Sequence, residues 1–347
     1  MSKWYLEKGP ESDVAISSRV RLARNLEKYT FPSRISDEEA VKLVDEIKTL
    51  VLSSDKFKGY NFSYFNMQLI DPLNRQVLVE KHLISPDLAR GNKPSAALIS
   101  RDEKISMMVN EEDHLRIQCL FSGMQIDNAV KLGKIVDDKL DSLVEYAFDK
   151  EFGYLTCCPT NLGTGIRISI MMHLPGLAMS GYLNSIFEAC SKLGVAVRGM
   201  YGEHTEAQGN LFQFSNQVTL GQSDEEIAKN IKNIAAQIIE QERRLREQLY
   251  SQNKYMMEDK IFRSLGVIQN ARIISSDESL KLLSYVRMGV DMGIIKTVST
   301  ETLNEIMLIT RPACLQKIIG RELSPEERDI ERANLIRSRL NTNSGEH

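Results

Sequence analysis

Residues 105–121, "ISMMVNEEDHLRIQCLF", contain two apolar runs that are separated by only a short polar segment. The runs at residues 105–110 and 117–121 have the length and composition of β-strands. A connection this short cannot contain a crossover helix, so two such strands must pair antiparallel. The stretch therefore predicts an antiparallel sheet and argues against a doubly wound parallel one.

Other segments on both sides of this stretch show strand or helix patterns. We expect further strands at residues 76–80, 96–100, 165–174, 195–200 and 211–220. We expect helices at residues 127–149 and 180–193. Ser36 and Ser223 are each followed by Asp-Glu-Glu, which fits a capping box at the start of an amphipathic helix. Together these patterns predict the α+β class, with a largely antiparallel sheet flanked by helices.

The last quarter of the chain has no strand pattern. Three segments there, "SSDESLKLLSYVRMG", "STETLNEIMLITR" and "SPEERDIERANLIRSRL", each begin with a helix-start signature. The polar segment "YSQNKYMMEDK", at residues 250–260, is the expected boundary before them. We therefore expect an N-terminal tail at residues 1–13, a large domain at residues 14–250 and a small all-helical domain at residues 260–340.

The composition of the 347 residues excludes several classes of protein. A net charge of −3 gives no global basic field, so binding of phosphate or nucleic acid would require local arginine clusters. The five cysteines are odd in number and only Cys157 and Cys158 are close in sequence, which argues against a disulfide framework. The polar N-terminus and the lack of a long apolar run predict neither a signal peptide nor a membrane span. We expect a cytoplasmic protein.

The segment "SSRVRLARN", at residues 17–25, places two arginines at alternate positions. If the segment is a strand, Arg19 and Arg21 project from the same face and can present two guanidinium groups to one polyphosphate. If it is a helix, the two side chains diverge. A solvated charged surface is the alternative interpretation.

Two loops are rich in residues that suit a binding site. "TCCPTNLGTGIR", at residues 156–167, can turn tightly but lacks the Lys-Ser/Thr ending of a Walker loop. Its Cys158 is either a reactive thiolate near arginines or a small buried apolar residue. "VRGMYGEHTEAQG", at residues 197–209, presents Glu203 between glycines, as expected of a loop that closes over a substrate or of an ordinary surface turn.

Three consecutive acids stand in the opening stretch. Glu111, Glu112 and Asp113 repel one another unless a cation lies close by. Arg116 or a bound cation would relieve this repulsion. A solvated turn remains the alternative.

Taken together, these four segments resemble the signature segments of the phosphagen kinases, the family of creatine kinase and arginine kinase. "SRVR", "NEEDHLR", "CPTNLGTG" and "RGMYGEHTE" occur in the family's order, and the similarity covers about residues 14–249. The resemblance implies a glutamine synthetase-like catalytic domain that transfers a phosphoryl group from ATP, with Mg²⁺, to a guanidinium group.

The order of domains indicates a particular branch of this family. Phosphagen kinases typically carry a helical domain before "SRVR"; here we expect none before it and a helical domain after the catalytic one. With "KHLISP", "FRSLG" and "RDIERA", this order resembles the bacterial protein-arginine kinases. The expected activity is ATP-dependent phosphorylation of arginine side chains in proteins. The alternatives are a phosphagen kinase for small guanidino compounds and a non-catalytic reader of phosphoarginine or nucleotide.

The resemblance also implies site residues. Glu112 and Glu203 would flank the guanidinium, one of them as the catalytic base, and Cys158 would support them as a thiolate. The nucleotide phosphates would be held by Arg19, Arg21, Arg116, Arg167 and Arg198. The remaining nucleotide-binding residues would be Ser17, Ser18, Val20, His82, Ile168, Ser169, Ile170, Met171, Gly199, Met200, Tyr201, Gly202 and Glu203. Met171 replaces a histidine of the family, and Mg²⁺ would be held through the nucleotide without a protein ligand.

The C-terminal "RDIERA" resembles a phosphoarginine-binding motif. It comprises Arg328, Asp329, Ile330, Glu331, Arg332 and Ala333. Arg328 and Arg332 would share one helical face and grip the phosphoryl group while Asp329 pairs with the guanidinium; a charged solvated helix is the alternative. The resemblance further implies a homodimer, a zinc-binding activator protein, a Clp-type chaperone ATPase and a heat-shock repressor as partners. It implies neither direct nucleic-acid binding nor membrane binding.

Overall fold

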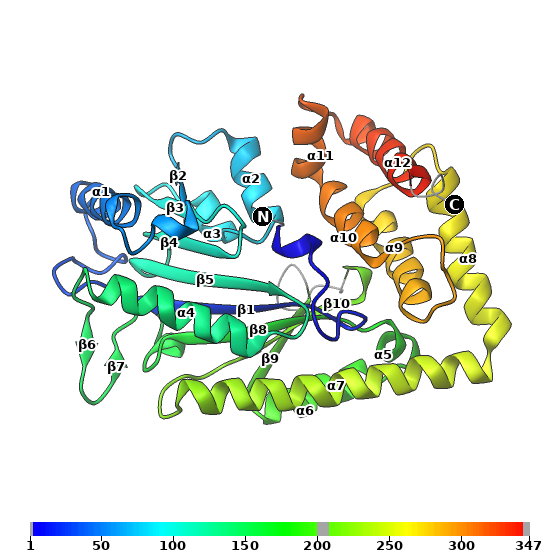
Figure 1. The fold of residues 1–347 in the computed structure, drawn as a ribbon, viewed down its shortest axis with the longest axis horizontal. Coiled ribbons are helices and arrows are strands. Elements are labelled where there is room, and N and C mark those ends of the chain that lie inside the picture. The colour runs from blue at the N-terminus through cyan, green and yellow to red at the C-terminus, as the bar shows by residue number, and fades with distance from the viewer. Residues whose placement is uncertain (1–2, 200–207, 343–347) are drawn as a thin grey trace.

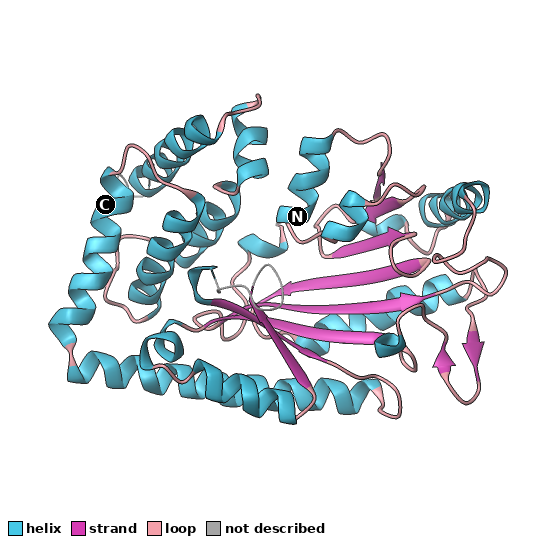
Figure 2. Ribbon diagram, turned by 180° about the vertical axis from the view of Figure 1, so that it is seen from behind, coloured by secondary structure: helices cyan, strands magenta, loops and turns pink. Residues whose placement is uncertain are grey.

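A computed structural model describes residues 3–199 and 208–342 of the chain. At its centre is an eight-stranded sheet in the order β2-β3-β4-β5-β1-β8-β10-β9, and every neighbouring pair is antiparallel (Figure 2). The strands are β1 (Ala15–Arg24), β2 (Ser63–Asn66), β3 (Ala96–Ile99), β4 (Ile105–Val109), β5 (Leu115–Ser122), β8 (Ile166–His173), β9 (Val195–Gly199) and β10 (Leu211–Asn216). The predicted antiparallel sheet is therefore confirmed. A separate hairpin consists of β6 (Phe148–Asp149) and β7 (Gly153–Tyr154).

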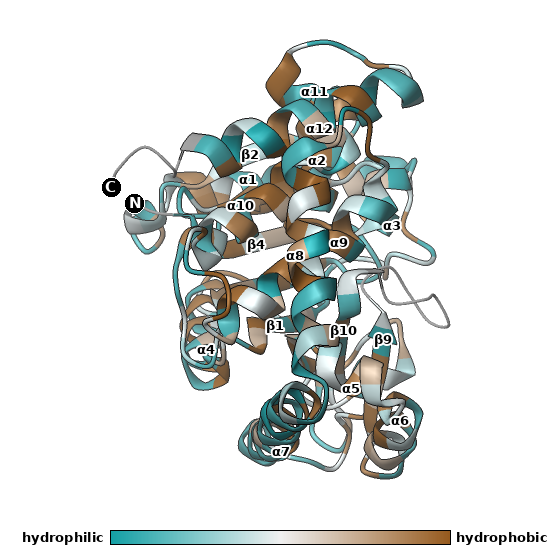
Figure 3. Cartoon of the chain, turned by 90° about the vertical axis from the view of Figure 1, so that its right-hand side faces the viewer, coloured by the Kyte–Doolittle hydropathy of each residue, from teal (hydrophilic) through white to brown (hydrophobic). Residues whose placement is uncertain are grey.

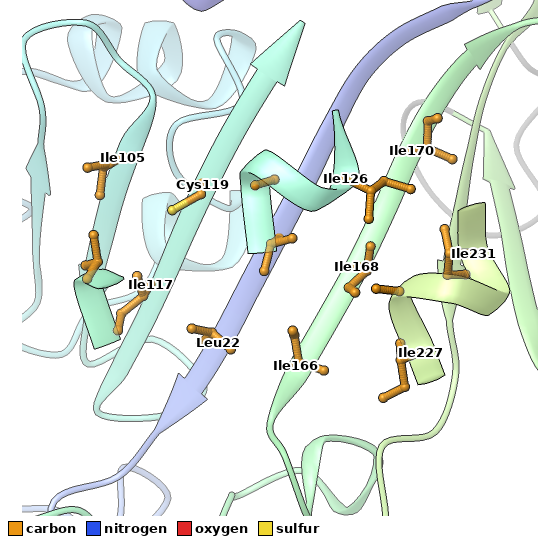
Figure 4. Packing of buried hydrophobic residues seen from close by; sticks show 14 of the residues in the cluster. Leu22, Ile105, Ile117, Cys119, Ile126, Ile166, Ile168, Ile170, Ile227 and Ile231 are labelled. Atoms are coloured by element: carbon orange, nitrogen blue, oxygen red, sulfur yellow. The ribbon is translucent and has the colours of Figure 1, made fainter. Parts of the chain in front are cut away.

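One face of the sheet carries the main hydrophobic core. It is covered by α1 (Asp37–Ser53), α4 (Ile126–Asp141), α6 (Leu183–Lys192) and α7 (Asp224–Gln252). Figure 4 shows the strand residues Leu22, Ile117 and Ile168 in one buried cluster with Ile126 of α4 and Ile231 of α7. The helices begin where their sequences indicate, because the Ser36 and Ser223 hydroxyls accept hydrogen bonds from the Glu39 and Glu226 backbone N–H groups.

The opposite face is covered only in part. The turn η1 (Trp4–Leu6) and helices α2 (Pro72–Glu80) and α3 (Pro86–Arg90) pack over β3, β4 and β5 through a second core. Trp4 belongs to this core and is 6% exposed. The start of the chain is therefore packed against the sheet, and the expectation of an N-terminal tail at residues 1–13 is wrong for the segment around Trp4.

The C-terminal domain is all-helical, as predicted. Its helices are α8 (Lys254–Asn270), α9 (Ser276–Asp291), α10 (Thr300–Ile309), α11 (Pro312–Ile319) and α12 (Pro325–Thr342). Their apolar residues gather in a core of their own, and Figure 3 shows this concentration along α8, α9 and α10. Among the helices in the described part of the chain, none has the length and apolar character needed to cross a membrane. The short elements α5 (Pro175–Ser180), η2 (Lys58–Tyr60), η3 (Pro159–Asn161) and η4 (Gln208–Asn210) complete the fold.

Polar contacts hold the helical domain beside the sheet (Figure 1). The buried Glu80 carboxylate at the end of α2 accepts hydrogen bonds from the Ala313 and Cys314 N–H groups at the start of α11. Arg287 of α9 donates to the Ser12 carbonyl at 2.7 Å. These contacts seat α11 against the end of α2, and α9 against the segment that precedes β1.

The structure corrects two of the expected elements. Residues 76–80 are the end of α2 rather than a strand, because the Asp71 side chain caps the Asn74 N–H and Pro72 starts the helix. Helix α4 ends at Asp141, well before residue 149, and the chain then enters the β6–β7 hairpin. The segment expected as a boundary, residues 250–260, contains the junction at Asn253 between α7 and α8, which begins at Lys254.

Candidate active site

The segment "SSRVRLARN" is extended. It forms most of β1, in which Val20 and Leu22 are each 1% exposed and face the main core. Successive side chains of a strand point to opposite faces, so Arg19 and Arg21 both point to the other face. The strand interpretation of these two arginines is therefore confirmed over the helical one.

The register of the sheet gathers five arginines on that face. Arg21 lies opposite Arg167 of β8, and Arg116 of β5 lies opposite Ala23. Arg198 of β9 lies opposite Gln213 of β10. We call Arg19, Arg21, Arg116, Arg167 and Arg198 the arginine cluster.

The arginine cluster is a concentration of positive charge. Burial, Arg167 and Arg116 lower the pKa of Arg19 to about 10. Burial and the same neighbours, together with Arg19, lower the pKa of Arg21 well below its ordinary value. Burial and neighbouring cations disfavour the charged forms of both arginines, so an anion bound here would be favoured.

Neutral side chains orient Arg19 and Arg167 without cancelling their charge. Arg19 donates Nε to Ser169 Oγ at 3.3 Å and Nη2 to Gln213 Oε1 at 2.6 Å. Arg167 donates Nη2 to Ser215 Oγ at 3.1 Å. Arg21 makes no hydrogen bond or ion pair with any described residue, which leaves all its donors available for a ligand.

The acidic turn lies at the edge of this cluster. Arg116 pairs with Glu111 at 2.6 Å and with Glu112 at 2.8 Å, so the expectation that Arg116 relieves the acids' repulsion is confirmed. The Glu111 side chain is 3% exposed and also accepts a hydrogen bond from Ser85 Oγ at 2.6 Å. The Glu112 side chain is 42% exposed. The Glu111 side chain therefore has a structural role, whereas the Glu112 carboxylate is accessible to a substrate.

Asp113 and His114 hold the turn in place. Asp113 is fully buried, and its Oδ1 accepts hydrogen bonds from Asn25 Nδ2 and the Cys157 N–H, both at 2.7 Å. His114 Nδ1 accepts from the Leu26 N–H at 3.0 Å. Asp113 thus ties the acidic turn to the loop at residues 156–167, and both residues have a structural role.

The loop at residues 156–167 places Cys158 beside the acidic turn. It is half-buried, and its Sγ lies 3.0 Å from Thr160 Oγ1. Glu112 and Cys158 both act to raise the pKa of Arg167, so both lie near this member of the arginine cluster. The neighbouring Cys157 differs, since burial and Asp113 raise its thiol pKa to about 11. All five cysteines are free.

The other candidate residues divide between the two faces of the sheet. Ser17, His82, Ser169 and Met171 line a narrow space beside Arg19. The buried side chains of Ser18, Val20, Ile168 and Ile170 point to the α4 and α7 face. Because side chains alternate along a strand, these four point away from the arginine face, and their assignment to the nucleotide site stays a prediction. Gly199 ends β9, while Met200, Tyr201, Gly202 and Glu203 lie outside the described residues.

Comparison with known proteins decides the family. Residues 42–245 match the model of the ATP:guanido phosphotransferase C-terminal catalytic domain, and residues 254–347 match that of the protein-arginine kinase McsB C-terminal domain. A protein named protein-arginine kinase from Bacillus pumilus is 51% identical, over 98% of this chain and 93% of its own length. Another from Bacillus subtilis is 50% identical over the same shares. The chain belongs to the protein-arginine kinase family.

Solved structures of related enzymes share the fold of the family's catalytic domain. The duplicated taurocyamine kinase from Schistosoma mansoni, with bound transition-state analogue components, matches with a TM-score of 0.60 and 26% identity. That match covers 68% of this chain and 34% of the longer enzyme. Lombricine kinase matches with a TM-score of 0.59 at 22% identity, over 70% of this chain and 69% of its own, and this likeness concerns the fold alone.

The C-terminal motif of this family member lies on α12, away from the catalytic sheet. Arg332 is 1% exposed and donates to the carbonyls of Thr310 and Ile274, each at 2.9 Å. It also pairs with Asp329 at 2.5 Å. The expected geometry, in which Arg328 and Arg332 together grip a phosphoryl group and Asp329 binds a guanidinium, is therefore not what the structure presents. Arg332 is instead used to join α12 to the loops beside α9 and α10.

Two polar residues of the site were not anticipated. Gln213 and Ser215 of β10 orient Arg19 and Arg167 from the arginine face. Their signal was present in "LFQFSN", where the polar Gln213 and Ser215 alternate with the apolar Phe212 and Phe214. Alternation alone could not reveal their role, because it does not identify the strand that lies alongside.

Proposed function

We propose that the protein is an ATP-dependent protein-arginine kinase, which transfers the γ-phosphoryl group of MgATP to the guanidinium of arginine side chains in proteins. The observation that carries this proposal is the arginine cluster on one face of the sheet, with the Glu112 carboxylate and Cys158 beside it. Relatives named protein-arginine kinase, about half identical over nearly the whole chain, support it.

The arginine cluster is suited to the phosphate end of the reaction. Phosphoryl transfer spreads negative charge over the phosphoryl oxygens, and donors fixed in advance stabilise that charge. Arg21, with all its donors available, and Arg167, held by Ser215, would bind these oxygens. Mg²⁺ would enter with the nucleotide and neutralise part of its charge through phosphate oxygens.

Glu112 is suited to the guanidinium end. A guanidinium has a pKa above about 12, so its nitrogen becomes nucleophilic only if a carboxylate orients it and takes its proton. As the N–P bond forms and the bond from phosphorus to the ADP oxygen breaks, the proton would pass to Glu112. Its present pairing with the Arg116 guanidinium at 2.8 Å supports this role. Cys158 would add negative charge near the substrate, and Glu203 is the proposed second carboxylate.

A second candidate is a phosphagen kinase that acts on a small guanidino compound. The 26% identity to taurocyamine kinase favours it as the runner-up. The two candidates share the transfer chemistry and differ only in whether the accepted guanidinium belongs to a protein or to a free small molecule. A substrate comparison therefore separates them.

The test is mass spectrometry of a generic substrate protein after incubation with MgATP, under conditions that preserve the acid-labile N–P bond. We expect phosphoarginine with the wild type, none with Glu112→Ala, and wild-type levels with Glu151→Gln, an exposed control. Phosphorylation of free arginine or taurocyamine but not of protein would replace the proposal with the second candidate. Nucleotide binding without any turnover would indicate a reader instead.

We further propose the partners and location that the family relationship suggests. These are a homodimer, a zinc-binding activator protein, a Clp-type chaperone ATPase that degrades the marked proteins, and a heat-shock repressor as substrate, all in the cytoplasm. The support is the relationship to bacterial protein-arginine kinases. Sedimentation of the purified chain tests the dimer, and pull-down of each candidate from the cells that make this protein tests the others.

A further inference from the structure

A pocket lies between the catalytic sheet and the helical domain, and we call it the interdomain pocket. Three parts of the chain line it: the N-terminal turn, the sheet with the end of α2, and helices α9 and α10 with the residues that follow. Its principal lining residues are Trp4, His82, Met171, Met307, Leu308 and Arg311.

The interdomain pocket is continuous with the arginine cluster. Trp4, Ser17, His82 and Met171 line both this pocket and the narrow space that reaches Arg19. A ligand whose phosphates bind the cluster can therefore extend its other end along Ser17 and Met171 until it lies beneath α10. The direction is set by the structure, because α2, α3 and their core cover the sheet on the side of β3 and β4.

The chemistry of the interdomain pocket suits a purine base. Trp4, Met171 and Leu308 offer flat or flexible apolar surface against which a ring can stack. The buried indole Nε1 of Trp4 has no hydrogen-bond partner among the residues that the structure describes. A buried donor of this kind usually has a partner, and purine ring nitrogens are acceptors. Burial and the charges of Arg311 and Arg19 lower the pKa of His82, so a neutral imidazole also faces the space.

The two walls of the interdomain pocket are fixed to each other next to the pocket itself. Glu80 holds the start of α11 through the Ala313 and Cys314 N–H groups, and the flanking residues His82 and Arg311 are both pocket residues. Arg287 donates to Asn304 of α10 and to the Ser12 carbonyl of the N-terminal segment. Movement of the helical domain would therefore reshape the pocket directly.

We propose that the C-terminal helical domain completes the ATP site: the adenine base occupies the interdomain pocket between Trp4 and α10, with Leu308 as part of its wall. This inference rests on the proposed use of ATP. Since residues of both domains would contact one ligand, nucleotide binding and the seating of the helical domain form one linked equilibrium. The catalytic domain alone would bind the triphosphate group but would bind the adenine base only weakly.

The first test compares two ligands on the full-length chain by calorimetry, namely Mg·ADP and Mg·tripolyphosphate, which lacks a base. Leu308→Ala removes pocket wall, and Ile309→Ala removes a similarly half-buried side chain of α10 that does not line the pocket. We expect Leu308→Ala to weaken Mg·ADP binding roughly three- to tenfold and to leave tripolyphosphate binding unchanged. Ile309→Ala should change neither. Thermal unfolding of both variants shows that they remain folded.

An unchanged affinity of Leu308→Ala for Mg·ADP, or an equal loss for both ligands, would overturn the inference alone. If the wild type bound neither ligand, the proposed function would fail together with it. The second test uses Trp4, the only tryptophan in the chain, as a fluorescent reporter. Mg·ADP should change its emission and tripolyphosphate should change it much less. Emission that does not respond to saturating Mg·ADP would also overturn the inference.

Discussion

Arg116 donates Nη2 to Glu112 Oε2 at 2.8 Å, so the carboxylate that we propose to hold the substrate guanidinium already binds a guanidinium of the protein. The same arginine donates Nη1 to the buried Glu111. Arg116 therefore keeps its position through Glu111 when Glu112 turns to a substrate. This arrangement joins the acidic turn to the phosphate-binding arginines.

The first prediction separates the two ends of this ion pair. Glu112→Gln should lower kcat by about 10²–10⁴-fold with little change in the KM for ATP, because the variant retains the shape but cannot take the proton. Arg116→Lys should chiefly raise the KM for ATP, because one forked cation of the cluster is lost. Steady-state kinetics at varied ATP measures both. Equal effects of the two variants on kcat would contradict these roles.

The second prediction concerns the uncompensated charge of Arg21. Arg21→Met should raise the melting temperature, because it removes a partly buried cation from among other cations, and should weaken Mg·ADP binding at least about tenfold. The matched control lies on the same strand. Arg24 is buried and pairs with Asp137 at 2.7 Å, so Arg24→Met should destabilise the protein by about 3–5 kcal/mol. Thermal unfolding with and without Mg·ADP tests both, and destabilisation by Arg21→Met would refute the argument.

The third prediction is a pH dependence of stability that arises from Asp291. Burial raises its pKa from 3.8 to about 6, against the opposing effect of Arg287 and Arg246. Between these pH values the folded state binds the proton more tightly than the unfolded state, so this contribution stabilises the fold at low pH and is lost as pH rises through 6.

The wild type should therefore lose about 1.4 kcal/mol relative to Asp291→Asn between pH 5 and pH 7.5. Denaturant unfolding of both proteins at the two pH values measures this difference. Parallel pH profiles would mean that Asp291 does not titrate in this range.

The fourth prediction distinguishes the two arginines of the C-terminal motif. Arg332→Ala should destabilise the protein by roughly 2–3 kcal/mol, because the Thr310 and Ile274 carbonyls lose a buried charged donor. Arg328→Ala should change stability by no more than about 0.5 kcal/mol, since Arg328 is only half-buried. If the motif binds phosphoarginine, Arg328→Ala should weaken binding of a phosphoarginine peptide while it remains fully folded. A large loss of stability with Arg328→Ala would argue against this division.

Local signals in the sequence predicted most of the elements. Ser36 and Ser223 begin their helices through hydrogen bonds that span only three residues, so the sequence pattern and the structure must agree there. Residues 76–80 were misassigned because "QVLVE" is apolar enough for a strand. The information that corrects it, the Asp71 cap and Pro72, lies at the other end of the helix.

Other features depended on partners that are distant in the chain. Trp4 belongs to a polar segment whose composition predicts a tail. In the structure, however, the second core buries the Trp4 side chain. Arg332 belongs to a charged helix whose composition predicts exposure to solvent. In the structure, however, α9, α10 and the loops beside them bury the Arg332 side chain. In both cases burial is decided by elements that pack from elsewhere in the sequence, which composition alone does not encode.

The sequence by itself determined the antiparallel sheet, the helical C-terminal domain and the family signature, because each follows from short-range periodicity or from motifs. Only the tertiary structure decided that Arg167 lies opposite Arg21, that Arg116 pairs with Glu112, and that α10 lies over the pocket beside Arg19. The physical reason is that strand order, register and domain seating are selected by the packing of residues far apart in the chain. A local pattern fixes the face to which a side chain points, but not the residue that it meets there.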